Sequence, residues 1–256
     1  MNLSSHQSLP SKLRTIGFIA LSVLFLSACK ENPVDPPKEE IPTDVVNLTF
    51  KFNSFLTGPF ISSAGDTIAI NKLKFLMSGF ILEKTTGEFV VLPDAYGFLS
   101  LTERIDSFIL KNVPKGEYKS VRFMVGIDSA INHANPQQWA LTHPMNPSVN
   151  DMHWGWSGGY IFNVIEGYYK NNGFDKAFSF HVALDKNARR YSYVTNYTII
   201  RNSTFTFNVD AQKYFSNVIN FGLKTDGDFS HSGDPDPVMD KFMQNIGGVI
   251  DFTSFK

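Results

Sequence analysis

The chain has 256 residues, of which 43% are hydrophobic and 14% aromatic, so it is long and apolar enough to bury a sizeable core. Its formal net charge of −1 offers nothing that would attract a nucleic acid. The sequence has one cysteine, which excludes an intrachain disulfide and any zinc or iron–sulfur site built from several cysteines.

The N-terminus predicts a lipoprotein signal peptide over residues 1–28. Lys12 and Arg14 precede the apolar run IGFIALSVLFLSAC, which is too short for a permanent transmembrane helix and ends at small residues. Leu26-Ser27-Ala28 resembles a bacterial lipobox, in which the following cysteine is lipidated. We therefore expect Cys29 to anchor the protein at the outer membrane or cell surface of a Gram-negative envelope. A plain cleaved secretory signal is the alternative.

Residues 29–44 are expected to form a tether between the lipidated cysteine and the folded part. The stretch KENPVDPPKEEIPTDV is rich in proline and charge, so it cannot bury a core and should be extended. Residues 45–256 are then left as one folded domain.

The sequence of the first half of this domain predicts mainly β-strands. Residues 45–54, VVNLTFKFNS, alternate apolar and polar side chains, as a half-buried strand does. Residues 64–92 predict a turn at Gly65-Asp66 and then a hairpin, with a long strand, a Thr-Thr-Gly turn and a returning strand. Residues 106–128 predict a second hairpin around the turn at Pro114–Gly116.

Residues 129–158 have no clean period and predict a long ordered loop, with one short helical turn near Pro136–Gln138. Loops of this length inside a compact domain are usually functional. Strand patterns resume after the loop, and Asp236-Pro237 opens a C-terminal helix that carries apolar residues at helical spacing to Ile246. The predicted fold class is mainly β: an antiparallel β-sandwich with a long ordered loop and one short C-terminal helix.

The sequence motifs do not point to an enzyme. There is no Gly-rich phosphate loop, no G-x-S-x-G nucleophile elbow and no H-E-x-x-H zinc helix. The acidic stretch at residues 226–236 lacks the ligand spacing and closing glutamate of an EF-hand. Glu166 and Asp185 are isolated carboxylates at strand positions, which usually face solvent.

Histidines are the stronger metal candidates, because imidazole suits Cu(I) at low coordination number. Five follow the predicted signal peptide: His133, His143, His153, His181 and His231. Alternation in FSFHVAL places His181 on the face opposite Phe180 and Val182, as either a hydrogen-bonded histidine or a ligand. His153 and His231 can likewise be solvent-facing residues or ligands. His133 is expected to brace the loop and His143 to lie in a turn.

Several segments in the same order resemble the MbnP-like family, a family of copper-associated periplasmic or surface proteins. These are VNLTFKFNSFLTG, INKLKFLMSGFIL, LKNVPKGEYKSVRFMVGID, MHWGWSGGYIFNVIEG, FSFHVAL and the C-terminal HSGD and QNIGGVIDF. The run M-x-W-x-W-x-x-G-Y-x-F-x-x-x-E-G, from Met152 to Gly167, is the most specific of them.

The resemblance implies a β-rich domain in which histidines hold copper and a tryptophan can be oxidised to kynurenine, with a dihaem peroxidase-like partner protein. Trp154 and Trp156 match the two tryptophans of the family, and His181 matches its strand histidine. We therefore expect His181, His153 and His231 to bind copper. Met152 and the two tryptophans would frame the site or be modified.

Two alternatives stay open. Trp154 and Trp156 lie two residues apart, so both can point to one face and fill the end of the sandwich core. Many relatives carry F-x-H in the first strand, where this chain has Phe50-Lys51-Phe52 and no histidine. The alternative function is therefore a metal-free surface lipoprotein that acts as an interaction or ligand-binding module.

Overall fold

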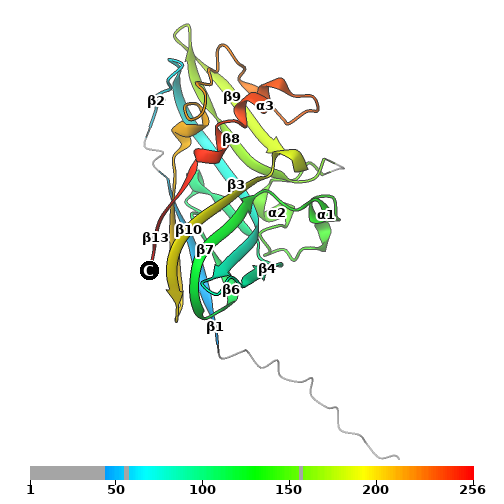
Figure 1. Ribbon diagram of the computed structural model, residues 1–256. Helices are drawn as coiled ribbons and strands as arrows, with labels where there is room; N and C mark the ends of the chain where they lie inside the picture. Colours follow the sequence, from blue (N-terminus) through cyan, green and yellow to red (C-terminus); the bar gives the residue numbers. More distant parts are fainter. Residues whose placement is uncertain (1–43, 55–57, 156–157) are drawn as a thin grey trace, which may run out of the picture. The chain divides into compact units, whose positions relative to one another are not determined.

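The computed structural model describes residues 44–54, 58–155 and 158–256 (Figure 1). The strands are β1 Val45–Ser54, β2 Phe60–Ile61, β3 Thr67–Lys84, β4 Phe89–Leu92, β5 Gly97–Ser100, β6 Ser107–Pro114, β7 Gly116–Val125, β8 Ile161–Asn171, β9 Phe174–Ala183, β10 Arg189–Ile199, β11 Ser203–Val209, β12 Phe229–Ser230 and β13 Ile250–Phe255. The α-helices are α1 Ser129–Asn132, α2 Pro147–Asn150 and α3 Pro237–Phe242. Short 3-10 helices span Leu101–Glu103, Pro136–Gln138, Asp185–Asn187, Ala211–Tyr214 and Ile246–Gly248.

The strands form two sheets that pack face to face, which confirms the predicted β-sandwich. One sheet has the order β13-β11-β1-β6, and the other has the path β10-β7-β3-β8-β9-β12, with β2, β4 and β5 also paired to β3. Phe50 of β1 joins the two layers. Its ring lies 5.3 Å from Phe80 of β3 and 5.5 Å from Phe207 of β11, measured between centroids. Buried aromatic rings of this kind supply a large part of the core, together with Leu, Ile, Val and Met side chains.

Most of the predicted elements are confirmed. The first strand has the predicted bounds, both hairpins are present, and the 3-10 helix Pro136–Gln138 lies where the loop was expected to turn. Most strand pairs are antiparallel, but β1 pairs with β11 and β9 pairs with β12 in parallel. Parallel pairs join segments far apart in the chain, and no local pattern reveals them.

The C-terminal helix begins as predicted and ends earlier. The Asp236 side chain caps α3 by accepting a hydrogen bond from the Met239 backbone N–H at 2.8 Å. Phe242 ends the helix and stacks on Phe180 of β9, with ring centroids 4.2 Å apart. Ile246 belongs to a separate 3-10 helix, so the apolar spacing of this segment continues beyond the helix.

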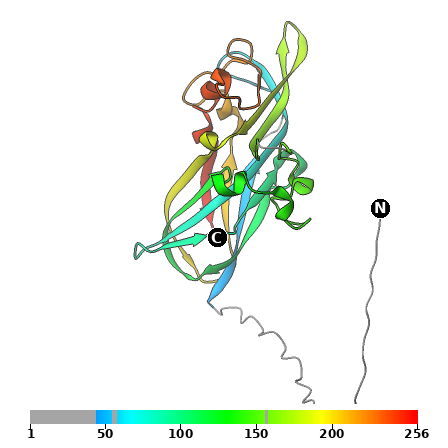
Figure 2. The same cartoon turned by 90° about the vertical axis from the view of Figure 1, so that its right-hand side faces the viewer.

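Side chains on the outer face of the nine-stranded sheet pack under the long loop. This second hydrophobic cluster includes Tyr96, Met145, Met152, Tyr160 and Val164. Figures 1 and 2 show that α1 and α2, which belong to the loop, lie at a different level of the sheet from α3. The loop therefore covers one part of the outer face and borders the strands that carry the candidate histidines.

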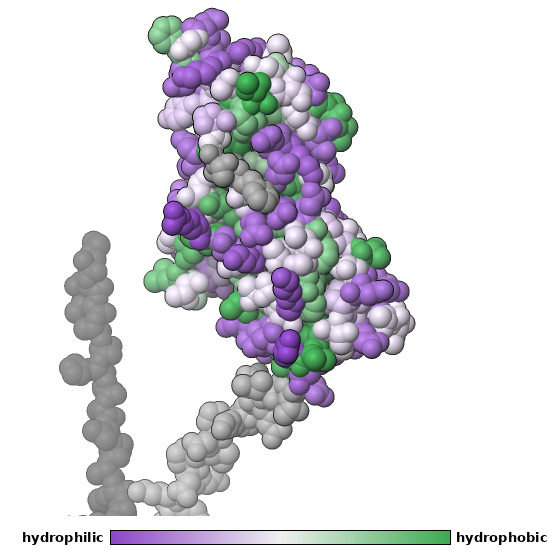
Figure 3. All heavy atoms as spheres, turned by 90° about the vertical axis from the view of Figure 1, so that its left-hand side faces the viewer, coloured by the Kyte–Doolittle hydropathy of each residue, from purple (hydrophilic) through white to green (hydrophobic). Residues whose placement is uncertain are grey.

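The predictions for residues 1–43, which include the signal peptide, Cys29 and almost all of the tether, lie outside the described residues. Within the ranges that are described, no helix is long and apolar enough to cross a membrane. On the face shown in Figure 3, hydrophobic residues are scattered among hydrophilic ones.

Candidate functional site

Three aromatic rings from separate segments meet on the outer face of the nine-stranded sheet. The rings of His181 and His231 are parallel, with an interplanar angle of 1° and centroids 4.3 Å apart. The ring of Trp154 lies against both, with its centroid 5.5 Å from that of His181 and 5.2 Å from that of His231. We call Trp154, His181 and His231 the ring cluster. It joins the long loop, β9 and the segment after β12.

Strand register explains why the two histidines meet. In the parallel pair of β12 and β9, Phe229 lies opposite Ser179 and Ser230 lies opposite Phe180. The next residues along the two strands are His231 and His181. Side chains at matching positions of neighbouring strands point to the same face, so the imidazoles come side by side. Phe180 and Val182 are buried on the core side, and His181 points to the outer face, as the alternation predicted.

Glu166 of β8 holds the His181 ring. Its Oε1 lies 2.7 Å from His181 Nε2, and its Oε2 pairs with Lys72 Nζ at 2.9 Å. Burial raises the pKa of Glu166, but the hydrogen bonds from His181 and Lys72 outweigh it and bring the pKa below its usual value. Glu166 is therefore a carboxylate at neutral pH and accepts the Nε2–H of His181.

This hydrogen bond occupies Nε2, so Nδ1 is the ring nitrogen of His181 that could coordinate a metal ion. In the neutral tautomer with the proton on Nε2, Nδ1 carries a lone pair. Nδ1 is buried and has no hydrogen-bond partner in the part of the chain that the structure describes. Buried polar atoms in proteins are nearly always hydrogen-bonded, so this unsatisfied nitrogen requires an explanation.

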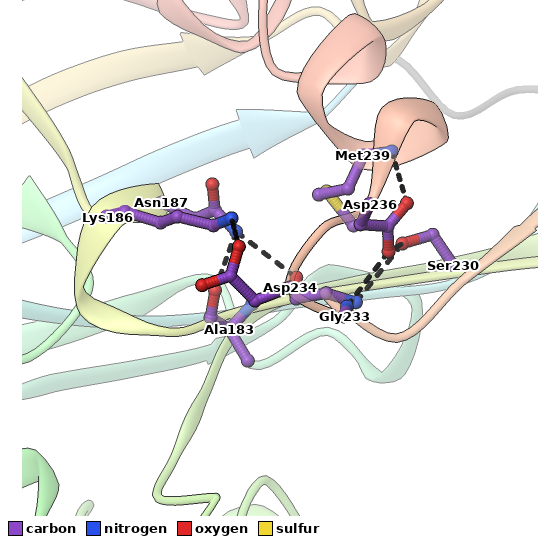
Figure 4. A network of polar contacts seen from close by, with 9 residues as sticks. Ala183, Lys186, Asn187, Ser230, Gly233, Asp234, Asp236 and Met239 are labelled. Atoms are coloured by element: carbon purple, nitrogen blue, oxygen red, sulfur yellow. Dashed lines mark hydrogen bonds and ion pairs between the residues drawn. The ribbon is translucent and has the colours of Figure 1, made fainter.

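Side-chain hydrogen bonds fix the segment that carries His231. Ser232 Oγ donates to the His181 carbonyl at 2.9 Å and accepts from the Ala183 N–H at 2.9 Å. The Asp236 carboxylate accepts from the hydroxyl of Ser230 at 2.6 Å and the N–H of Gly233 at 2.9 Å (Figure 4). His231 itself is exposed, and partial burial together with the nearby charge of His181 lowers its pKa. These hydrogen bonds hold the backbone on both sides of His231, and the lowered pKa favours the neutral ring.

The other predicted site residues have different surroundings. His153 is half-buried; its ring packs edge-on against Tyr160 at 4.6 Å, and its Nδ1 accepts from the Gly155 N–H at 2.8 Å. His153 lines the same pocket as Trp154 and His181. Met152 is fully buried in the second hydrophobic cluster. Trp156 lies outside the described residues.

Trp154 packs against the core and also contacts the histidine pair. It is half-buried and packs against the second hydrophobic cluster, at its edge. The same side chain contacts both rings of the histidine pair. Trp154 therefore helps to close the outer face and also forms one wall of the candidate site.

Imidazole is a suitable ligand for copper, but the ring of His231 would have to change its orientation before both histidines could bind one ion. A metal bound to imidazole lies in the ring plane, along the nitrogen lone pair. Two parallel stacked rings have planes that do not meet, so His231 must rotate before both rings can ligate one ion. The His231 residue is exposed, and its ring also lies 4.3 Å from the ring of Phe229, so this rotation would change its ring contacts. Among the described residues, no group of three or more His, Cys, Asp or Glu side chains is arranged to hold a metal.

Glu166, which was expected to be an isolated carboxylate facing solvent, is half-buried on the outer face and is paired with His181 and Lys72. Its place in the tryptophan motif, fourteen residues after Met152, was the one local signal that it belongs to the site. Asp185 also has partners, because it accepts from Asn132 Nδ2 at 2.7 Å and lies 3.3 Å from His133 Nε2. His133 therefore braces the loop, as expected.

Three comparisons with known proteins were made, and the match to a family model agrees with the motifs. The MbnP family model matches residues 43–233. Among solved structures, MbnP from Methylosinus trichosporium matches at 14% sequence identity over 73% of this chain and 80% of that chain, with a TM-score of 0.45. A search of curated proteins gave no significant match.

Proposed function

The chain belongs to the MbnP family, and we propose that it is a lipid-anchored protein of the cell envelope that binds copper through His181 and His231 beside Trp154. The observation that carries the proposal is the pairing of Glu166 with His181. A histidine that ligates a metal usually gives its other ring N–H to a carboxylate, which fixes the tautomer and makes the ligating nitrogen more basic. Glu166 does this at Nε2, and the buried Nδ1 lacks a hydrogen-bond partner among the described residues.

His231 is the second proposed ligand, because the β12 register places its ring beside that of His181. Its lowered pKa favours a neutral imidazole, the form that binds metal. His153 borders the same pocket and is the candidate for a third ligand. Bound copper would supply one-electron redox chemistry next to the Trp154 indole. The protein's own residues would orient the imidazoles and keep the Nε2 proton of His181 on the side of Glu166.

The location and the partner are proposed on sequence grounds. The apolar run that ends at Cys29 and the Pro-rich stretch after it support a lipid anchor with a tether at the outer membrane or cell surface. The resemblance of the tryptophan motif supports a dihaem peroxidase-like partner that would oxidise Trp154 or Trp156. Mass analysis of tryptic peptides from the native protein tests this, since kynurenine formation changes the mass of one tryptophan peptide.

Copper retention by the mature chain with Cys29→Ser tests the main proposal. The metal-free protein is equilibrated with Cu(I), passed over a weak chelating resin and assayed for bound copper. We expect retention close to one ion per chain, and a large loss in both His181→Ala and His231→Ala. His133→Ala is the matched control, because His133 is an exposed histidine whose ring bonds Asp185 outside the ring cluster.

Copper retention near zero in the unsubstituted protein, or retention that His181→Ala leaves unchanged, would contradict copper binding at this site. The alternative hypothesis, that the domain is a metal-free interaction or ligand-binding module, would then be favoured.

A further inference from the structure

Lys74 of β3 is a buried lysine, and no charged partner of it is found among the described residues. The residue is 7% exposed. In the part of the chain that the structure describes, no carboxylate pairs with its Nζ, whose one aromatic contact is a distant one with Phe98, 6.0 Å to the ring centroid. The apolar stem of the side chain is buried, and the small exposed part of the residue leaves the ammonium group little contact with water. An ammonium group held in this way, without an opposite charge beside it, is suited to an anionic ligand.

The ammonium borders a pocket on the same face as the ring cluster. Lys74 lies opposite Val164 of β8, and Val164 lies opposite His181 of β9, so the three side chains form one row across the outer face. A cavity of about 220 Å³ lies between this row and the long loop. Lys74, His181 and Trp154 are among the residues that line it.

The remaining charges leave the positive charge of Lys74 uncompensated. Lys72 also lines the pocket, but it pairs with Glu166 at 2.9 Å, so these two charges cancel. Asp151, also in the lining, is exposed and does not form an ion pair with Lys74. An anion that entered the pocket would therefore meet an ammonium group that is ready to donate hydrogen bonds.

We propose that this cavity, the Lys74 pocket, binds a small carboxylate whose oxygens accept hydrogen bonds from Lys74 Nζ. The size of the cavity limits the ligand, because pockets for drug-sized molecules begin at about 300 Å³. The carboxylates of Glu166 and Asp151 border the same space, so a singly charged anion is favoured over phosphate, which carries more charge. The inference needs no metal and goes beyond the proposed copper site.

An NMR titration of the metal-free mature chain with Cys29→Ser tests the proposal. Sodium acetate is added at constant ionic strength while the indole N–H signal of Trp154, assigned with Trp154→Phe, is followed. We expect a saturable shift of this signal in the unsubstituted protein. We expect Lys74→Met, which keeps the length of the side chain and removes its charge, to weaken acetate binding at least tenfold.

Lys170→Met is the matched control, because Lys170 lies on β8 and pairs with Asp175 at 2.9 Å, away from the pocket. It should bind acetate as the unsubstituted protein does. A Trp154 signal that does not respond to acetate overturns the proposal without any variant, and equal affinity in Lys74→Met also overturns it. Tighter binding of inorganic phosphate than of acetate would overturn the assignment to a singly charged ligand.

Discussion

Substitution of Ser232 tests how the segment that carries His231 is held in place. Ser232 is 4% exposed, and its hydroxyl donates a hydrogen bond to the His181 carbonyl and accepts one from the Ala183 N–H, both at 2.9 Å. Ser232→Ala would leave both backbone groups without a partner. A buried polar group left unsatisfied costs about 1–3 kcal/mol, so we expect the free energy of unfolding to fall by roughly 2–4 kcal/mol.

The backbone of Ser232 separates this effect from local strain. Its φ of +54° lies in the left-handed region, which costs an alanine roughly 1 kcal/mol and a glycine almost nothing. Ser232→Gly removes the same hydroxyl, so it should be destabilised less than Ser232→Ala by about that amount. Ser63→Ala, at an exposed serine, should change stability by less than about 0.5 kcal/mol.

Urea denaturation of the three variants measures these differences. A loss below about 0.5 kcal/mol in Ser232→Ala would refute the hydrogen-bond argument, since surface substitutions alone give changes of that size. A glycine variant less stable than the alanine variant would refute the strain argument.

Three further predictions concern other parts of the molecule. Asn245→Ala should lower the free energy of unfolding by about 3 kcal/mol or more in urea denaturation, because the buried amide bonds the Val218 and Ile219 N–H groups and the carbonyls of Tyr214 and Ile219. Glu166→Gln should weaken Cu(I) binding about 10–100-fold in a competition titration, whereas Glu83→Gln, which removes a carboxylate paired to Lys119 and Arg122, should not. Burial lowers the pKa of His153 and of His231, so the unfolded state takes up protons first as the pH falls, and the free energy of unfolding should decrease from pH 7.5 to 6. Substituting both histidines with glutamine should reduce that dependence, while His143, whose pKa burial also lowers, retains part of it; an unchanged slope would contradict the argument.

Local sequence patterns predict the first strand and the face of β9 on which His181 lies. Alternation over residues 45–54 predicts β1 with its observed bounds, because the odd and even side chains face a core and a solvent side. The same alternation places His181 on the outer face of β9. These features depend on neighbours within a few residues, which a single sequence displays.

The meeting of His181 with His231 depends on interactions that no local pattern contains. β12 has only two residues, too few for a period, and its parallel pairing with β9 joins segments about fifty residues apart. The side chain of Ser232 then ties the segment before α3 to β9, and the side chain of Asp236 caps the start of α3. Glu166 was missed for a related reason: a lone carboxylate on a strand reveals its partner only when the neighbouring strand is known.

The first strand of this chain lacks the histidine that many relatives carry, and the positions of residues 50–52 show where such a side chain would lie. Phe50 and Phe52 are buried between the two sheets, where the Phe52 ring stacks on Phe207 with centroids 5.0 Å apart. Lys51 points to the solvent side of the four-stranded sheet. The ring cluster lies on the outer face of the other sheet, so none of the side chains at positions 50–52 of this chain points toward it. A histidine at position 52 would enter the aromatic core. The first strand of this chain therefore supplies no ligand to the proposed copper site, which depends on His181, on the Glu166 carboxylate that orients it, and on His231.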